Sequence, residues 1–291
     1  MRKLFLTIVV VSVASMVNVA IADDLRGDLN IDGAVNAADV SELYSIIIGG
    51  PKPTTDPLKN DTIGLDGVEF EMIAVEGGTF KMGYAFGNSD TQPVHRVTLS
   101  SFKICKIEVT QEQWAEVMGY NNSEHKGAKF PVTNVTWDEV QTFIRELNSL
   151  TGHNFRLPTE AEWEFAARGG NLSQGYTYSG SNTLKDVGWY NTYNYSWSWD
   201  TKSGAQKMPN ELGIYDMSGN VDEWCSDWYR PYEAGQQTNP TGPETGTTKV
   251  YRGGNHANNS VTNGPHTVYS RKYKKPDESG NYTGFRLVLI D

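Results

Sequence analysis

Residues 171–291 constrain the fold of this chain more than any other part of the sequence. They alternate short strand-like runs with long loops rich in Gly, Asn, Ser and Trp, and show little of the apolar spacing that marks a helix. Long loops in a compact domain commonly carry function, because a rigid scaffold presents them. The sequence therefore predicts an α+β domain with few regular elements and functional loops.

Strands and three helices are predicted ahead of this region. Residues 72–83 have the short apolar runs and glycines of a hairpin, and residues 95–110 continue in strand-like alternation. Each helix is predicted to begin at a threonine that is followed three residues later by Gln or Glu, which is the capping-box pattern. The pairs are Thr110 and Gln113, Thr136 and Glu139, and Thr159 and Glu162. In the second helix, apolar residues recur with helical spacing and predict a core face: Val140, Phe143, Ile144 and Leu147.

Residues 1–22 have the pattern of a secretory signal peptide. Arg2 and Lys3 precede an apolar run, and Ala20-Ile21-Ala22 forms a small-x-small cleavage signal. The alternative is a membrane anchor, since the apolar run is nearly long enough to span a bilayer. The cleavage signal and the acidic continuation favour an exported protein that is secreted, periplasmic or associated with the cell surface, with no membrane segment after cleavage.

The charge of the chain bears on its partners. The formal net charge is -10 at pH 7. Such an acidic chain lacks the excess of basic residues that binds nucleic acid or anionic lipid. Cation binding fits this composition better.

Residues 23–50 predict a calcium-binding loop followed by a helix. Oxygen-bearing side chains recur there in the twelve-residue register of a calcium loop, with Gly33 at the sharp turn. The predicted metal positions are Asp28, Asn30, Asp32, Ala34, Asn36 and Asp39. The segment resembles a single dockerin repeat of EF-hand-like design, which implies a cohesin-like partner, although families of this type carry two repeats. The alternative is an Asp/Asn-rich turn without a metal, and the proline-containing residues 51–66 predict a linker.

Four strings, in order, resemble the formylglycine-generating enzyme family, also called sulfatase-modifying factors. They are "RLPTEAEWEFAARGG" (156–170), "NELGIYDMSGNVDEWCSDWY" (210–229), "VYRGG" (250–254) and "GFRLVL" (284–289). The resemblance covers residues 67–291 and implies a C-type-lectin-like fold with calcium as a structural ion, to which Asn220 and Glu223 would supply oxygens. Active members of the family use molecular oxygen and a cysteine pair that holds copper(I), and oxidise a sulfatase cysteine to formylglycine.

The positions of that cysteine pair are occupied by Asn258 and Asn263 in this chain, and Asn255 stands where a serine commonly follows the glycine pair. Copper(I) is soft and prefers thiolates, which an amide cannot replace. The two cysteines of the chain, Cys105 and Cys225, lie elsewhere, and the sequence leaves open whether they are bonded to each other or are separate buried thiols. Copper is therefore not expected, and neither is formylglycine-generating activity.

Aromatic and polar side chains predict a binding surface instead. Residues 189–200 alternate aromatic rings with Asn, Ser and Thr, a composition typical of contact surfaces and suited to stacking on sugars. The predicted ligand-binding residues are Trp189, Tyr190, Tyr193, Tyr195, Trp197, Trp199, His256, Asn258, Asn259, Asn263 and His266. The alternatives are that the loop packs its own rings beneath it, and that each histidine is satisfied internally or solvated.

These observations support three hypotheses for function. The first is a secreted, calcium-stabilised, non-catalytic module that binds a glycan, peptide or protein. The second is a divergent formylglycine-generating oxidase, which the ordered motifs favour and the absent cysteines oppose. The third is an accessory subunit of a polysaccharide-degrading assembly, positioned by its dockerin-like repeat.

Overall fold

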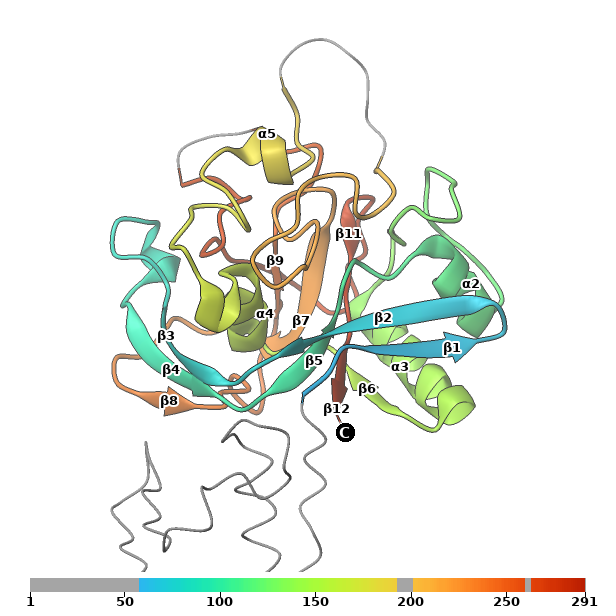
Figure 1. Cartoon of the computed structure of the whole chain (residues 1–291), viewed down its shortest axis with the longest axis horizontal. Helices are drawn as coiled ribbons and strands as arrows, with labels where there is room; N and C mark the ends of the chain where they lie inside the picture. Colours follow the sequence, from blue (N-terminus) through green and yellow to red (C-terminus); the bar gives the residue numbers. More distant parts are fainter. Residues whose placement is uncertain (1–57, 193–200, 260–262, 291) are drawn as a thin grey trace, which may run out of the picture. The chain divides into compact units, whose positions relative to one another are not determined.

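The computed structural model of the chain describes residues 58–192, 201–259 and 263–290 (Figure 1). The predicted signal peptide and dockerin-like repeat lie outside these residues, and so does the predicted calcium loop. The same holds for four predicted ligand-binding residues, Tyr193, Tyr195, Trp197 and Trp199. These stay predictions.

Three small sheets frame the described domain. Their strand orders are β1-β2-β5-β12-β6, β10-β9-β7-β11 and β3-β4-β8. The strands are β1 (Asp61–Leu65), β2 (Val68–Val75), β3 (Gly78–Met82), β4 (His95–Leu99), β5 (Phe102–Cys105), β6 (Asn154–Arg156), β7 (Asp222–Trp228), β8 (Gln237–Thr238), β9 (Lys249–Arg252), β10 (Lys272–Lys274), β11 (Thr283–Gly284) and β12 (Val288–Ile290). Each sheet joins strands that are distant in sequence. In the five-stranded sheet, the carboxy-terminal β12 lies between β5 and β6 and joins them.

The helices within the described residues are few and short. They are α2 (Gln111–Met118), α3 (Trp137–Thr151), α4 (Glu160–Ala167) and α5 (Leu184–Val187), with 3₁₀ turns at Ser89–Thr91 and Gly170–Leu172. The mixed sheets and few helices confirm the predicted α+β class. None of the helices described is long and apolar enough to cross a membrane.

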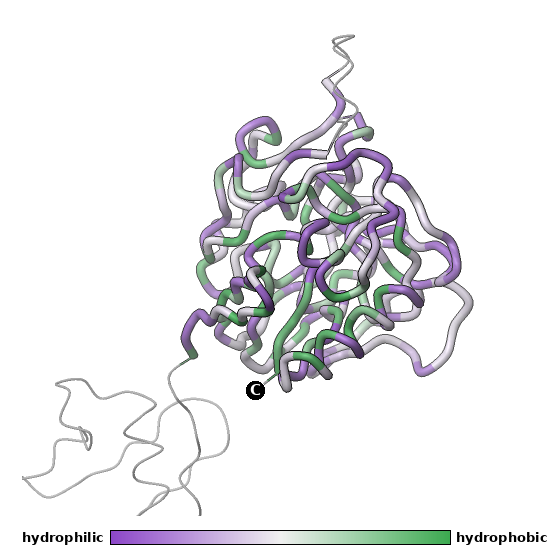
Figure 2. The backbone as a smooth tube through the Cα atoms, turned by 90° about the vertical axis from the view of Figure 1, so that its right-hand side faces the viewer, coloured by the Kyte–Doolittle hydropathy of each residue, from purple (hydrophilic) through white to green (hydrophobic). Residues whose placement is uncertain are grey.

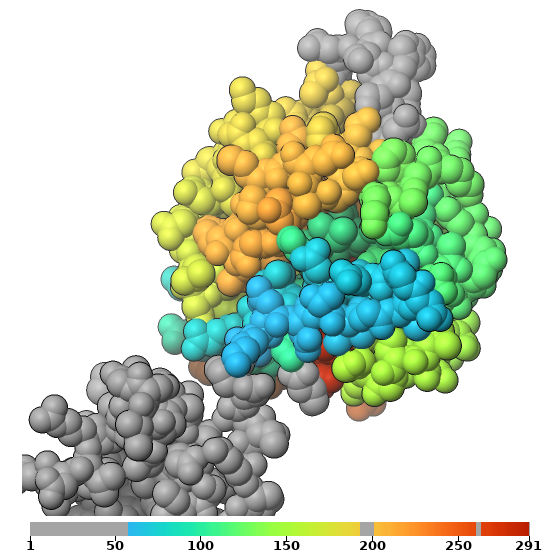
Figure 3. All heavy atoms as spheres, turned by 45° about the vertical axis from the view of Figure 1, so that its right-hand side comes forward, coloured from blue at the N-terminus to red at the C-terminus, as the bar shows by residue number. Residues whose placement is uncertain are grey.

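The five-stranded sheet separates two hydrophobic clusters. Side chains alternate between the faces of a strand, so Met72 and Cys105 face one cluster while Ile73 and Ile104 face the other. Helices α2 and α3 complete the first cluster, and α4 with β3 and β4 completes the second. Figure 2 shows hydrophobic stretches running through the body of the domain. In Figure 3 the blue residues of β1 and β2 lie beside the green helical region.

All three predicted capping boxes are confirmed. Thr110, Thr136 and Thr159 each accept a hydrogen bond from the backbone three residues later, and the Gln or Glu side chain there bonds back to the cap. The predicted apolar face of α3 is buried, as the spacing indicated. Local capping chemistry is enough to set these helix starts, because it satisfies backbone N–H groups that have no partner within the helix.

The predicted hairpin at 72–83 is wrong. β2 and β3 do follow each other there, but β2 pairs with β1 and β5 whereas β3 pairs with β4. The glycines between them send the chain from one sheet to another. A Cβ at Gly77 would lie 2.5 Å from the carbonyl oxygen of Leu99, so the close passage of the two sheets requires a glycine.

The predicted linker is also too long. Residues 61–65 form β1, which pairs antiparallel with β2 through a turn at Asp66 and Gly67, and residues 60–291 form one compact unit. Both turn residues have positive φ, 40° for Asp66 and 93° for Gly67. An Asp-Gly pair between strands is a strong hairpin signal. The domain therefore begins at the start of β1 and not at Gly67.

Candidate functional site

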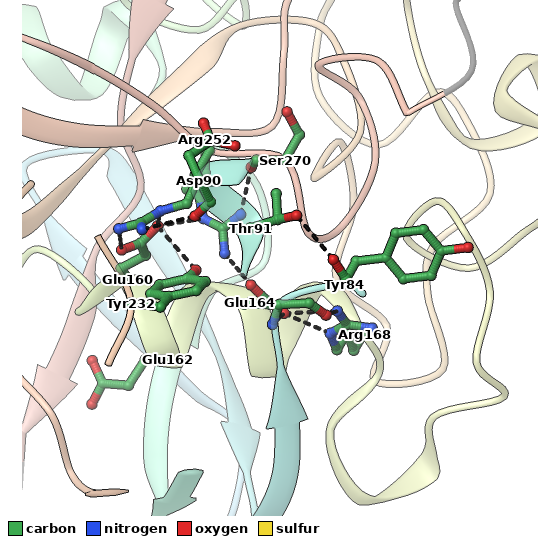
Figure 4. A network of polar contacts seen from close by, with 12 residues as sticks. Tyr84, Asp90, Thr91, Glu160, Glu162, Glu164, Arg168, Tyr232, Arg252 and Ser270 are labelled. Atoms are coloured by element: carbon green, nitrogen blue, oxygen red, sulfur yellow. Dashed lines mark hydrogen bonds and ion pairs between the residues drawn. The ribbon is translucent and has the colours of Figure 1, made fainter. Parts of the chain in front are cut away.

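Helix α4 carries two glutamates that pair with arginines from distant parts of the chain (Figure 4). Arg271 donates to both oxygens of Glu160, at 2.7 and 2.5 Å. Glu164 pairs with Arg252 and with Arg168, and the side chains of Glu164 and Arg252 are fully buried. Burial alone would raise the pKa of Glu164, but the charges of Arg168 and Arg252 outweigh it and lower that pKa. These pairs hold α4 to both ends of the loop that follows β9.

Two further glutamates have arginine partners. Glu162 points away from the network in Figure 4 and pairs with Arg156 at 2.6 Å. Glu223, in β7, is fully buried; Arg286 donates to its two oxygens at 2.6 and 2.7 Å, and Trp163 donates from Nε1 at 2.8 Å. Arg286 therefore neutralises the Glu223 carboxylate within the core.

Asn255 and Asn258 stand at two positions where the family resemblance implies reactive residues. Both side chains are hydrogen-bonded within the protein. Asn255 is buried and donates from Nδ2 to Asp222 at 2.5 Å. Asn258 accepts from Lys272 Nζ at 3.1 Å, and Lys272 also pairs with Asp222 at 3.2 Å. The cluster links the loop to β7 and β10. It offers amides, one carboxylate and one ammonium group, with no thiol.

Asn263 anchors the far end of the same loop. Its backbone is left-handed, with φ of 53°, which Asn tolerates better than most residues. Its Nδ2 donates to the carbonyl of Phe86 at 2.9 Å, and its Oδ1 accepts from the hydroxyl of Tyr269 at 2.8 Å. The side chain therefore fixes the loop against the segment after β3.

The two histidines of the loop are internal braces. His256 is buried, and its Nδ1 lies 2.9 Å from the carbonyl oxygen of Asn220. His266 is buried, and its Nε2 lies 3.1 Å from the carbonyl oxygen of Asn255. Burial lowers the pKa of His266. Both histidines are therefore satisfied within the protein, which was the alternative given for them. We leave them out of the proposed ligand-binding surface.

The structure brings the two predicted binding segments together. The backbone N–H of Asn191 donates to the carbonyl of Asn258 at 2.9 Å, and Asn191 and Asn259 form a parallel bridge. Trp189 and Tyr190 are half-buried here, with Trp189 beneath the ammonium of Lys207 at 4.2 Å from the ring centroid.

Two polar atoms at this junction lack a hydrogen bond. They are Nε1 of Trp189 and Oδ1 of Asn259, both buried in the described part of the chain. Since a buried polar atom without a partner is costly, a group that supplied a hydrogen bond to either atom would stabilise this junction. We call residues 189–192 and 257–259 the junction surface.

Both cysteines are free thiols in the core. Burial raises the pKa of Cys105 to about 12 and that of Cys225 well above its usual range. The thiolate is the form that binds copper and acts as a nucleophile. Neither cysteine can therefore take the role of the pair that the loop lacks.

Sequence reasoning missed a pair of buried carboxylates, Glu108 and Asp216. Glu108 accepts from Nδ2 of Asn220 at 3.1 Å, and Oδ1 of Asp216 is buried without a hydrogen-bond partner. Burial, and then the charge of Asp216, raise the pKa of Glu108 well above its usual range; burial raises that of Asp216 to about 6. Asp216 lies in the quoted 210–229 string, but its proximity to Glu108 arises only from the fold.

The fold and the site together define a scaffold domain in which buried arginine–carboxylate pairs hold long carboxy-terminal loops in place. Residues 66–290 match the family described as "Sulfatase-modifying factor enzyme 1-like domain". The chain belongs to this family, as the four ordered motifs indicated.

Relatives of known name support this membership. "Chaperone protein LppX" of Paenibacillus barcinonensis is 37% identical over 240 residues, covering 66% of this chain and 81% of that protein. The formylglycine-generating enzyme of Thermomonospora curvata is 30% identical over 288 residues, covering 75% of this chain and 92% of that enzyme. The solved structure of Treponema denticola variable protein 1 superimposes with a TM-score of 0.71 at 30% identity, covering 79% of this chain and 98% of that one.

Proposed function

We propose that the domain is a non-catalytic binding module that engages a glycan, peptide or protein through the junction surface. The observation that carries the proposal is the chemistry after Gly254. Where the family resemblance implies a copper-holding cysteine pair, this chain has Asn258 and Asn263, each held by hydrogen bonds within the protein. Amides provide neither a soft copper ligand nor a thiolate nucleophile.

The junction surface has the chemistry of a contact surface. Trp189 and Tyr190 supply amphipathic rings, and Asn259 supplies an amide whose oxygen is unpaired. Two relatives are named as a chaperone and as a variable protein and not as oxidases, which agrees with a role in recognition. We also propose that the protein is exported, with its dockerin-like segment available for a cohesin-like partner.

A divergent formylglycine-generating oxidase is the second candidate. The observation that favours it is the match to the Thermomonospora curvata enzyme over most of that enzyme's length. Family likeness of this kind establishes the scaffold, whereas an activity depends on groups at the site. Copper binding separates the two candidates directly.

The first test is copper(I) binding. Wild-type protein is expected not to compete for copper(I) with a chromophoric chelator, whereas N258C/N263C gains a copper(I) site because it restores two thiols at the loop positions. N258S/N263S is the matched control without thiols and should stay copper-free. Copper(I) held as tightly by wild type as by the double-cysteine variant would favour the oxidase instead.

A calcium ion, which the family resemblance implies, fits Glu108 and Asp216 better than Glu223. Calcium is bound by several oxygen atoms, and Asp216 has a buried oxygen with no hydrogen-bond partner. A cation there would also offset the desolvation and mutual repulsion that raise the pKa of Glu108. No group of three or more His, Cys, Asp and Glu side chains at metal spacing occurs among the residues described, so backbone carbonyls or water would complete the set.

We expect calcium to raise the melting temperature of the protein, and Asp216→Asn to remove most of that increase. A ligand that binds only the folded state stabilises it by an amount that grows with the logarithm of its concentration relative to Kd. Because the predicted loop at 28–39 is a separate calcium candidate, the comparison is made on residues 58–291 as well as on the whole mature chain. If calcium raises the melting temperature of residues 58–291 equally with and without Asp216→Asn, the ion binds elsewhere.

A further inference from the structure

A second candidate site lies away from the residues of the junction surface. A cavity of about 420 Å³ is bounded by the start of α4, the end of β7 and the segment from Arg230 to Pro243, which contains β8. Its volume is in the range of small-molecule sites. None of its lining residues belongs to 189–192 or 257–259. The function proposed above makes no use of it.

The charged groups that line this cavity are mostly neutralised by one another. Glu160 is paired with Arg271, and Arg230 is paired with Glu233. Arg271 also donates to the backbone carbonyls of Asp90 and Arg230, so four of its five N–H groups have partners. An anionic ligand would therefore gain little here, because it would have to displace a glutamate from its arginine.

Asp227 presents one oxygen to the cavity. Its Oδ2 accepts from the backbone N–H of Glu160 at 2.9 Å and from the hydroxyl of Ser226 at 3.0 Å. Among the described residues no donor reaches its Oδ1. Gly242 lies beside that oxygen, and a Cβ there would be 3.2 Å from Oδ1 and 2.9 Å from the Asp227 Cβ. The glycine, with φ of 72°, leaves the oxygen open.

The rest of the lining combines open hydrogen-bonding groups with flat apolar surfaces. The side chains of Gln237, Thr238 and Thr241 bond to no other part of the structure described, and each can donate and accept. The ring of Trp228 and three prolines supply apolar walls. Alternating hydroxyl, amide and carboxyl groups beside flat apolar walls match a ring that carries hydroxyls at its edge and C–H groups on its faces.

We propose that this cavity binds one residue of a neutral saccharide, with Asp227 Oδ1 accepting from ring hydroxyls and residues 237–243, which are β8 and the turn after it, lying along the sugar's edge. The site is independent of the junction surface. It would give the domain a saccharide contact even where the main ligand is a protein. Affinity for a single sugar is expected in the millimolar range, because one small ring buries little surface.

The experiment is saturation-transfer difference NMR on the mature protein with methyl glycosides of glucose, galactose, mannose and N-acetylglucosamine, and with glucuronic acid. We expect at least one neutral glycoside to receive saturation, and glucuronic acid to receive less. Thr241→Phe fills the cavity from its exposed rim and should weaken that signal at least tenfold. Thr245→Phe adds the same ring to an exposed threonine outside the lining and should leave it unchanged.

Asp227→Asn provides the second variant. Its amide oxygen can keep the bonds from Glu160 and Ser226 while an NH₂ group replaces the open acceptor, so sugar binding should weaken without unfolding, as circular dichroism would show. The proposal is overturned if no neutral glycoside binds, if Thr241→Phe binds as well as wild type, or if glucuronic acid binds best. None of these outcomes affects the copper(I) comparison, so failure here is distinguishable from failure of the proposed function.

Discussion

Replacing Arg286 by methionine should lower the free energy of unfolding by about 3–5 kcal/mol. The substitution leaves Glu223 fully buried without the guanidinium that donates to both of its oxygens. Because a whole domain is stable by only about 5–15 kcal/mol, the variant should be close to the limit of folding. Urea denaturation followed by circular dichroism measures the loss.

Two variants control this prediction. Arg156→Met breaks the Glu162 pair, whose arginine side chain is 32% exposed. Water screens that pair, so the expected loss is about 1 kcal/mol or less. E223L/R286M removes both buried charges and should recover part of the loss. Equal losses for Arg286→Met and Arg156→Met would show that burial of the Glu223 pair does not matter as we argue.

Gly219→Ala is expected to destabilise the domain by about 2–5 kcal/mol, from backbone strain and overpacking together. Gly219 has φ of 111°, and an added Cβ would lie 2.3 Å from the carbonyl oxygen of Trp189 and 2.9 Å from its nitrogen. The clash would push away the segment that carries the junction surface. Ligand binding at that surface should therefore fall together with stability.

Gly213→Ala separates strain from clash. Gly213 also has positive φ, 82°, but a Cβ there would meet no atom within 4 Å. Only the backbone strain remains, so the expected loss is about 1–2 kcal/mol. If the two alanine variants unfold at the same urea concentration, close packing of Gly219 on Trp189 contributes nothing.

Local signals predicted the helices well. The capping boxes at Thr110, Thr136 and Thr159 depend on residues three positions apart, so the sequence contains all that is needed to place them. The turn between β1 and β2 also has a local signal, because the Asp66-Gly67 pair favours a hairpin turn. Sheet membership was not local. Whether β3 pairs with β2 or β4 depends on how distant strands pack, which spacing within 72–83 does not reveal.

The candidate site, too, could be predicted from the sequence only in part. The replacement of the cysteine pair could be seen in the sequence, since Asn258 and Asn263 follow a recognisable glycine pair. Two features could not be seen, because their partners are far apart along the chain: the pairing of Glu223 with Arg286 and the buried pair of Glu108 and Asp216. A carboxylate in a motif can equally serve an ion pair or a metal until its partner is known.

Formylglycine formation shows directly whether this domain has the oxidase chemistry of its family. A sulfatase-type Cys-x-Pro-x-Arg peptide is incubated with the mature protein, copper and oxygen, and its mass is compared with that of peptide treated by a family member that has the cysteine pair. We predict an unchanged cysteine with this protein and conversion with the other. Conversion of the peptide by this protein, lost on Asn258→Ala, would show that the domain is an oxidase and not only a binding module.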